Sequence, residues 1–396
     1  DAAGLLPDDQ TALLEYVTGA LDAPTSVFVL TRGRTGPQVA QARVLPSADS
    51  VTGTIGRFIA LLAKGEDPGA AGRQLSAALL EPALAILPPQ VTRLIIVPDG
   101  PLHRVPWDAL RLADGRYLVE RYAVGIVPSA ATLRVLRRRT PAPSTAPTSL
   151  LAFGDPTFSS DTTGDARLFA GVGGLARLPA SGDEARSVAR YAAASEVRLR
   201  KDASEDYLLR APLAGFGVIH FATHAIVDDR ALNRTVLALA PGGAGDGFVT
   251  PGQLATLRLS AAMVVLSACR TAGGVVVDGE GVQGLTAPLL EAGARSIVAT
   301  AWRVSDRATA GFVERFYRQL AEGKPVVEAL RDTRLASMRA GEPAKVWAAF
   351  SVVGDPMVTI LLRTPASATS WWVFGSGLVV ALVVAAARRR RLSGKA

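Results

Sequence analysis

Short apolar runs alternate along the chain with longer segments in which apolar side chains recur every three or four residues. A short apolar run between polar or glycine-rich sequence is typical of a buried strand, and the longer period is typical of an amphipathic helix. The clearest apolar runs are residues 26–30, 93–97, 149–153, 218–221, 263–266 and 296–301. Strands that alternate with helices predict an α/β fold in which helices cover both faces of a mostly parallel sheet.

The best marked of the expected helices covers residues 305–322. Ser305 or Asp306 can cap its beginning, and Gly323 ends it. Four apolar side chains at helical spacing form one face of it: Phe312, Val313, Phe316 and Leu320. The same spacing, with less sharply marked ends, predicts helices over residues 71–87 and 183–193.

Two polar stretches divide the chain. Residues 140–148 hold three prolines, which predicts a stiff, extended linker. This linker separates a first half, residues 11–139, from a second half, residues 149–362. A stretch of small and polar residues, 364–370, then separates the second half from an apolar tail.

The apolar tail is a candidate membrane anchor. Residues 371–387 carry no charge, and as a helix they would span about 26 Å, slightly less than the roughly 30 Å hydrocarbon core of a bilayer. Two tryptophans at its beginning and the basic tail at its end, residues 388–396, suit the two membrane interfaces. We therefore expect a single-pass carboxyl-terminal transmembrane helix in the lipid bilayer. The positive-inside rule favours the arginines in the cytoplasm, but the side of the folded part stays open, and a sorting tail that is cleaved off is the alternative.

Charge gives little reason to expect nucleic acid as a partner. The net charge is +8, but five of the 43 basic residues lie in residues 388–396, which leaves 38 against 35 acidic residues, or +3. The single cysteine excludes an internal disulfide and any multi-cysteine metal site. Arginine greatly outnumbers lysine, which is typical of a G+C-rich bacterial genome.

The only cysteine and one of the three histidines both end predicted strands. Cys269 follows the run that begins at residue 263, and His224 ends the run that begins at residue 218, about 45 residues before the cysteine. In open α/β sheets, ligands bind at the carboxyl ends of the strands. A thiol needs a nearby base to become a nucleophile, and imidazole is the usual one. A histidine followed at this distance by a cysteine is also the chain order of caspase-type peptidases.

Other roles for these residues stay open at this point. A lone cysteine in an apolar run is more often a small buried side chain than a nucleophile. Ser267 is a rival nucleophile, although no Gly-x-Ser-x-Gly turn surrounds it. On a strand, His220 and His224 would be about 13 Å apart, too far to share an ion, so we expect no metal and a core position for His220. The glycines of residues 171–174 do not stand between a strand and a helix, so they do not indicate a dinucleotide site.

Taken together, the motifs resemble the CHAT domain family, separase-like cysteine peptidases of the caspase-type clan. The matching segments are residues 94–102, 122–129, 150–156, 218–224, 265–271, 279–285, 292–299, 301–306, 347–350 and 354–356. The resemblance extends over residues 13–362. It implies a caspase-type α/β fold, with a parallel sheet sandwiched by helices. Residues 11–139 would form a degenerate caspase-like half, and residues 149–362 the catalytic caspase-like half.

The resemblance also implies a catalytic site. His224 would be the general base and Cys269 the nucleophile, and the backbone N–H groups of Ala225 and Cys269 would stabilise the oxyanion. The family usually has glycine at the position of Ala225. An alanine still offers an N–H group, provided that the position does not require a positive φ.

Three acidic residues are weaker candidates for binding a basic substrate side chain: Asp278, Glu280 and Asp306. For each of them, solvation in a loop or capping of a helix is the plainer interpretation.

We therefore expect a membrane-anchored cysteine endopeptidase that cleaves protein or peptide substrates, needs no cofactor and is restrained by a regulatory protein or an upstream region. The alternative is a non-catalytic pseudoprotease that serves as an interaction module at the membrane. Ala225 points mildly to that alternative, and the presence of both His224 and Cys269 points against it. Alkylation of Cys269 by an electrophilic peptide distinguishes the two.

Overall fold

The computed structural model describes residues 4–19, 22–33, 36–139, 148–158, 175–227, 235–268, 271, 274–277 and 281–365. Asp1–Arg363 form one compact unit. Cys269, Asp278, Glu280, residues 140–147 of the linker and both parts of the tail lie outside the described residues. Within the described ranges, no helix is both long enough and apolar enough to cross a bilayer. The expected anchor at residues 371–387 therefore stays a prediction.

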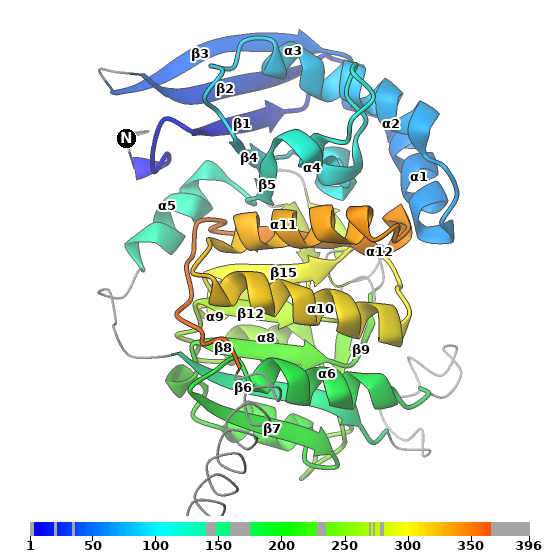
Figure 1. Cartoon of the computed structure of the whole chain (residues 1–396), viewed down its shortest axis with the longest axis vertical. Coiled ribbons are helices and arrows are strands. Elements are labelled where there is room, and N and C mark those ends of the chain that lie inside the picture. The colour runs from blue at the N-terminus through cyan, green and yellow to red at the C-terminus, as the bar shows by residue number, and fades with distance from the viewer. Residues whose placement is uncertain are drawn as a thin grey trace, which may run out of the picture. The chain divides into compact units, whose positions relative to one another are not determined.

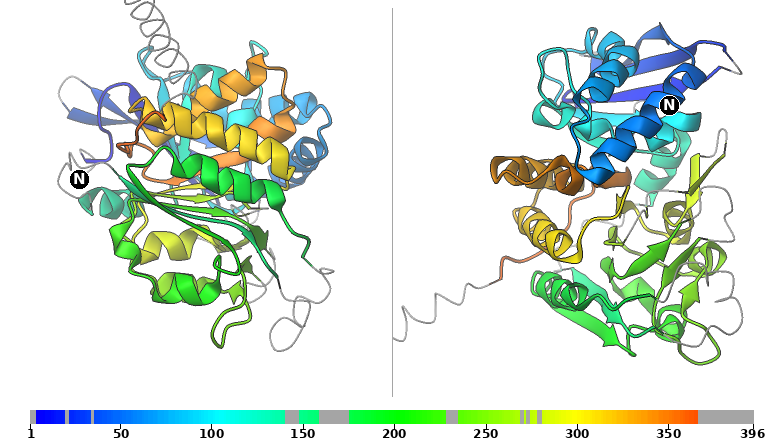
Figure 2. Two further views of the ribbon diagram at one scale, coloured as in Figure 1. Left: turned by 60° about the horizontal axis from the view of Figure 1, so that its bottom comes forward. Right: turned by 90° about the vertical axis from the view of Figure 1, so that its right-hand side faces the viewer.

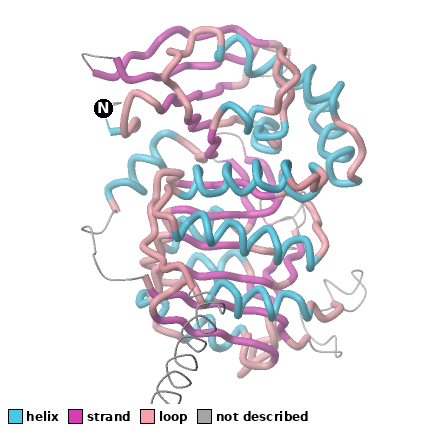
Figure 3. The backbone as a smooth tube through the Cα atoms, in the orientation of Figure 1, coloured by secondary structure: helices cyan, strands magenta, loops and turns pink. Residues whose placement is uncertain are grey.

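The described residues form one large sheet of eleven strands (Figure 1). In spatial order these are β3 (Gly36–Leu45), β2 (Thr25–Gly33), β1 (Thr11–Val17), β4 (Arg93–Val97), β5 (Ala123–Ile126), β16 (Phe350–Gly354), β15 (Ser296–Thr300), β12 (Met263–Leu266), β8 (Val218–Ala222), β6 (Ser149–Pro156) and β7 (Ala194–Arg200). Figure 3 shows these strands side by side. Two smaller sheets consist of β9 (His224–Ile226), β10 (Val236–Ala238) and β11 (Phe248–Val249), and of β13 (Gly274–Val277) and β14 (Gly281–Gly284).

Most neighbours in the large sheet are parallel, as the alternation of strands and helices predicts. Only the pairs β3/β2, β2/β1 and β16/β15 of this sheet are antiparallel among the described strands. The neighbours β15, β12 and β8 run in one direction, so their carboxyl ends meet at the same edge. Every residue of these three strands is buried, which explains why their sequences read as continuous apolar runs rather than as alternating ones.

Helices cover both faces of the sheet (Figure 2). On one face lie α6 (Pro179–Ala189), α10 (Asp306–Ala321) and α11 (Val326–Arg339), and on the other α7 (Glu205–Arg210), α8 (Pro251–Thr256) and α9 (Thr286–Ala292). Successive strand residues enter different cores: Met263 and Val265 pack with the first set of helices, and Val264 and Leu266 with the second. This is the sandwich of helices around a sheet that the sequence predicts.

The remaining helices belong mainly to the amino-terminal part. They are α1 (Ala48–Lys64), α2 (Gly69–Leu75), η2 (Ser76–Leu80), α3 (Glu81–Leu84), η3 (Gly100–Arg104), η4 (Trp107–Ala109), α4 (Leu118–Arg121), α5 (Ala130–Arg138), η6 (Leu213–Gly215) and α12 (Ala344–Trp347). The helix expected over residues 71–87 is present as one continuous helical segment over residues 69–84, in which η2 is a π-helical turn between α2 and α3.

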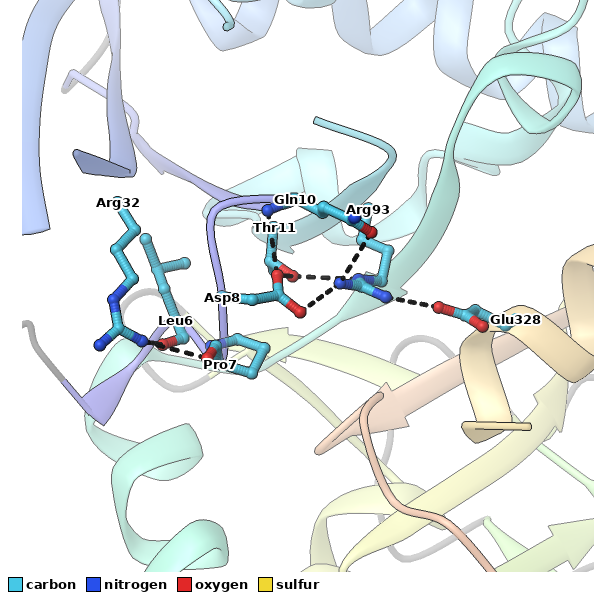
Figure 4. A network of polar contacts seen from close by, with 8 residues as sticks. All are labelled: Leu6, Pro7, Asp8, Gln10, Thr11, Arg32, Arg93 and Glu328. Atoms are coloured by element: carbon cyan, nitrogen blue, oxygen red, sulfur yellow. Dashed lines mark hydrogen bonds and ion pairs between the residues drawn. The ribbon is translucent and has the colours of Figure 1, made fainter. Parts of the chain in front are cut away.

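The amino-terminal and carboxyl-terminal parts share one sheet, because β16 lies between β5 and β15. Polar contacts add to this connection (Figure 4). The guanidinium of Arg93 on β4 bonds to Glu328 on α11 at 2.6 Å, to the Thr11 hydroxyl at 3.1 Å and to Asp8. The parts of the chain before and after the linker thus complete one sheet and contact each other through polar side chains. Their division into two caspase-like halves stays a prediction.

A buried ion pair lies between the same two parts. Arg334 on α11 is fully buried and bonds to the Asp108 carboxylate and to the carbonyl of Phe350 on β16. Burial raises the pKa of Asp108 to about 6, and the charge of Arg334 opposes that shift. Removal of one partner of such a pair is strongly destabilising, because the other charge stays buried without its counter-ion.

We expect Asp108→Ala to lower the free energy of unfolding by about 3–5 kcal/mol, because it leaves the Arg334 guanidinium buried without its counter-ion. Urea unfolding followed by circular dichroism measures this. Asp114→Ala is the control, since Asp114 pairs with Arg116 at an exposed site. The urea midpoint of this variant should match that of the parent chain. Equal midpoints for all three proteins would show that the buried pair does not support the fold.

Candidate active site

A cavity of about 240 Å³ lies at the edge of the sheet where the three buried parallel strands end. Thr223 and His224 follow β8, Ser267 and Ala268 follow β12, and Thr300 with residues 302–306 comes from the end of β15 and the beginning of α10. Parallel pairing brings these strand ends together, as expected for a ligand site in an α/β sheet.

His224 is held in one orientation by a backbone contact. Its Nε2 lies 2.7 Å from the carbonyl oxygen of Ala176, and its ring centroid lies 5.3 Å from that of Phe158. A carbonyl oxygen only accepts, so Nε2 carries the proton in this contact. The neutral imidazole therefore has its acceptor lone pair on Nδ1, the atom that is available to take a proton.

The surroundings of His224 favour the neutral ring. Burial lowers the pKa of His224, and the positive charge of Arg303 acts in the same direction. The contact with Ala176 and the negative charge of Asp306 oppose the shift without cancelling it. A neutral imidazole at ordinary pH is the form that a general base requires.

The Ala176 carbonyl is itself held in place by the next residue. Arg177 Nε and Nη2 bond to the two carboxylate oxygens of Asp155, at 3.2 and 2.6 Å. Asp155 is buried at the end of β6, has a φ of 44° and also pairs with Arg200. This bidentate contact fixes the backbone whose carbonyl accepts the hydrogen bond from His224 Nε2.

Cys269 lies outside the described residues, but the chain on both sides of it is described. Ala268, directly before it, lines the cavity, and its carbonyl accepts a hydrogen bond from the Thr300 hydroxyl. Thr271 is fully buried; its hydroxyl donates to the Leu266 carbonyl at 3.1 Å and accepts from the Thr300 N–H at 2.9 Å. Ala268 and Thr271, the described residues on either side of Cys269, are thus both joined to Thr300 at the end of β15.

Ala225 lies in β9, opposite Leu237 of β10. It is not among the residues that line the cavity. Of the described non-glycine residues, only Asp155 and Arg200 have a positive φ, so an alanine fits the backbone at position 225 without strain. Replacement of glycine by alanine at this position therefore requires no distortion of the strand.

Asp306 lines the cavity and also caps a helix, although not its own. Its Oδ2 accepts the N–H of Ala180 at 3.0 Å, in the first turn of α6, where Leu178 provides no side-chain cap. Burial, followed by the charge of Glu184, raises the pKa of Asp306, and the N–H groups of Ala180 and Ser181 oppose this. The carboxylate therefore takes the place of an N-cap in α6.

His220 lies in the core, as expected from its place within a strand. It is fully buried, with Nε2 2.8 Å from Glu184 Oε1 and Nδ1 3.2 Å from the Tyr317 hydroxyl. In the described part of the chain, no group of three or more His, Cys, Asp and Glu side chains could hold a metal ion.

Several residues of the site were not among those expected from the sequence. Trp302 and Arg303 directly follow the apolar run that ends at residue 301, and this position at a strand end is a signal that could have found them. The carbonyl of Ala176 carries no such signal, because its role depends on an ion pair between Asp155 and Arg177.

Comparisons with known proteins agree with this architecture. The family model "CHAT domain" matches residues 69–355, so the chain belongs to the CHAT domain family. Saccharomyces cerevisiae separase, solved in complex with securin, superimposes with a TM-score of 0.55 and 12% identity over 89% of this chain and 30% of that chain. At this identity the likeness shows a separase-like, caspase-type fold and no more.

Curated relatives include tetratricopeptide repeat protein 28 of Mus musculus, with 26% identity over 316 residues, and that of Homo sapiens, with 24% over 319 residues. Each match covers 69% of this chain and 12% of the relative. The chain is therefore similar to a small part of these proteins.

We expect Arg303→Ala to raise the pKa of His224, because it removes a positive charge that disfavours the imidazolium. A histidine-selective NMR titration measures the shift. Arg307→Ala, which removes an equal charge on α10 outside the cavity lining, should leave that pKa where it is. An unchanged or lower value in Arg303→Ala would contradict the electrostatic account of the site.

Proposed function

We propose that this chain is a cysteine endopeptidase in which Cys269 is the nucleophile and His224 the general base. The observation that carries the proposal is the orientation of His224. Its Nε2 is occupied by the Ala176 carbonyl, which leaves Nδ1 as the proton acceptor, and the same cavity is lined by His224 and by Ala268, the residue before Cys269. Membership in the CHAT domain family and the separase-like fold support the same function.

The reaction would proceed by acyl transfer. Nδ1 of His224 takes the thiol proton as the sulfur of Cys269 attacks the carbonyl carbon of the scissile peptide bond. Backbone N–H groups at Cys269 and Ala225 would hold the oxyanion. The C–N bond then breaks, the imidazolium donates its proton to the leaving amine, and a thioester remains. Water, deprotonated by His224, cleaves the thioester and restores the thiol.

Protein substrates and a regulatory protein are part of the same proposal. The separase to which this fold is similar was solved in complex with securin. A protein partner that covers the cavity would restrain an endopeptidase in a comparable way. The chain spans only 12% of its curated relatives, and their other regions carry no argument about this chain.

The second candidate function is that of a non-catalytic interaction module. The position of Ala225 favours it, since this residue pairs within β9 and β10 and is absent from the cavity lining. Without a second N–H group the oxyanion would be less well stabilised, and the site would serve for binding alone.

We expect Cys269→Ala to abolish cleavage of a casein or peptide substrate, and His224→Ala to reduce kcat by at least about 10³-fold. The double variant should be no worse than Cys269→Ala, because nucleophile and base act as one unit. Arg186→Ala, on the exposed side of α6, is the control and should retain activity. Loss of activity in Ser267→Ala together with full activity in Cys269→Ala would assign the nucleophile to Ser267 instead.

The membrane anchor is a separate proposal, based on the uncharged residues 371–387 and the four arginines after them. We expect the full chain to stay with membranes in a carbonate wash. Truncation after Thr364 should release it with its activity intact, whereas removal of residues 388–396 alone should not, because the apolar segment remains. Recovery of the full chain in the supernatant would contradict the anchor.

A further inference from the structure

The charges around the cavity beside His224 are not equivalent. Arg303 lines the cavity, its side chain is exposed, and no hydrogen bond or ion pair joins it to another described residue. Asp306 also lines the cavity, but its carboxylate is already engaged by backbone N–H groups at the beginning of α6. Among the described lining residues, one cation is therefore available for a ligand, while the anion is committed to the fold.

Two neutral features of the cavity also favour an anion. Ser267 is only 7% exposed, and its hydroxyl has no partner among the described residues, although it lines the cavity. The cavity also includes the beginning of α10, where Ser305 makes no side-chain cap bond, so the first N–H groups of this 16-residue helix are not capped by it. A buried hydroxyl and an uncapped helix N-terminus both donate hydrogen bonds, and the helix dipole adds positive potential.

The size and lining of the cavity suit one side chain. At about 240 Å³ it is smaller than the pockets that enclose drug-sized ligands, which begin at roughly 300 Å³. Leu178, Trp302 and Val304 provide apolar walls for methylene groups. Because His224 and Ala268 line the same cavity, the substrate residue nearest to the scissile bond is the one within reach.

We propose that this cavity binds the carboxylate side chain of an aspartate or glutamate directly before the scissile bond, with Arg303 as its counter-ion. The inference rests on the proposed endopeptidase function and adds its substrate class. It replaces the weaker candidate role drawn from the sequence, in which Asp306 binds a basic side chain, and agrees with the plainer interpretation that Asp306 caps a helix. Turning the Asp306 carboxylate to a substrate cation would leave the N–H group of Ala180 without its acceptor, which is costly at a half-buried site.

The test uses the full chain and four peptides that differ only in the residue before the scissile bond: aspartate, glutamate, asparagine or arginine. We expect kcat/KM for the better acidic peptide to exceed that for asparagine by about 10- to 100-fold, the value of a hydrogen bond to a charged group, and arginine to be no better than asparagine. Arg303→Glu should reverse the order in favour of arginine. Arg307→Glu, the same charge change outside the cavity lining, should keep the original order.

A binding measurement separates this inference from the peptidase proposal. In Cys269→Ala, an acetylated peptide that ends in aspartate amide should shift the ring resonances of His224 and raise its pKa, because a carboxylate then lies nearby. The additional Arg303→Glu change should abolish the shift. If the parent chain cleaves none of the four peptides, and the aspartate peptide still binds in this way, the carboxylate site is supported and the peptidase function is contradicted. If cleavage occurs with arginine preferred, or if the aspartate peptide does not bind at His224, the carboxylate site is wrong.

Discussion

The parallel pairing of β8, β12 and β15 is the constraint on which the site depends. Each strand is buried on both faces, so its register is fixed by packing against two helical layers. Because the three strands run in one direction, the residues that follow them meet at one edge, although they are far apart in the sequence. His224, Ala268 and Arg303 enter a common cavity for this reason. A one-residue slip of β12 would exchange the two cores and remove Ser267 and Ala268 from the cavity.

Most of the described charges around this edge are engaged by the fold itself. Asp155 holds Arg177, which fixes the Ala176 carbonyl, and that carbonyl determines which nitrogen of His224 carries the proton. Asp306 caps α6 and at the same time partly offsets the effect of Arg303 on the pKa of His224. Within the described lining, the substrate is thereby left with a neutral base and one unpaired cation. This balance suits a thiol nucleophile, since the groups presented are a proton acceptor and amide or hydroxyl donors.

The sequence predicts the parts of this arrangement that depend on local pattern. The apolar runs at residues 218–221 and 263–266 are β8 and β12, and the helix expected over residues 305–322 is α10. The position of His224 at a strand end follows from the same pattern.

Contacts between distant segments could not be predicted in this way. Helix α6 begins at Pro179 rather than at residue 183, and its cap is Asp306, which is remote in the chain. The contact of Ala176 with His224 likewise depends on tertiary packing and not on spacing.

The most direct test of the central claim compares the rate at which a peptidyl electrophile alkylates Cys269 in the parent chain and in His224→Ala. Mass spectrometry identifies the alkylated residue. The account predicts rapid labelling that falls by orders of magnitude when His224 is lost; equal labelling of both proteins, or no labelling of either, would contradict it.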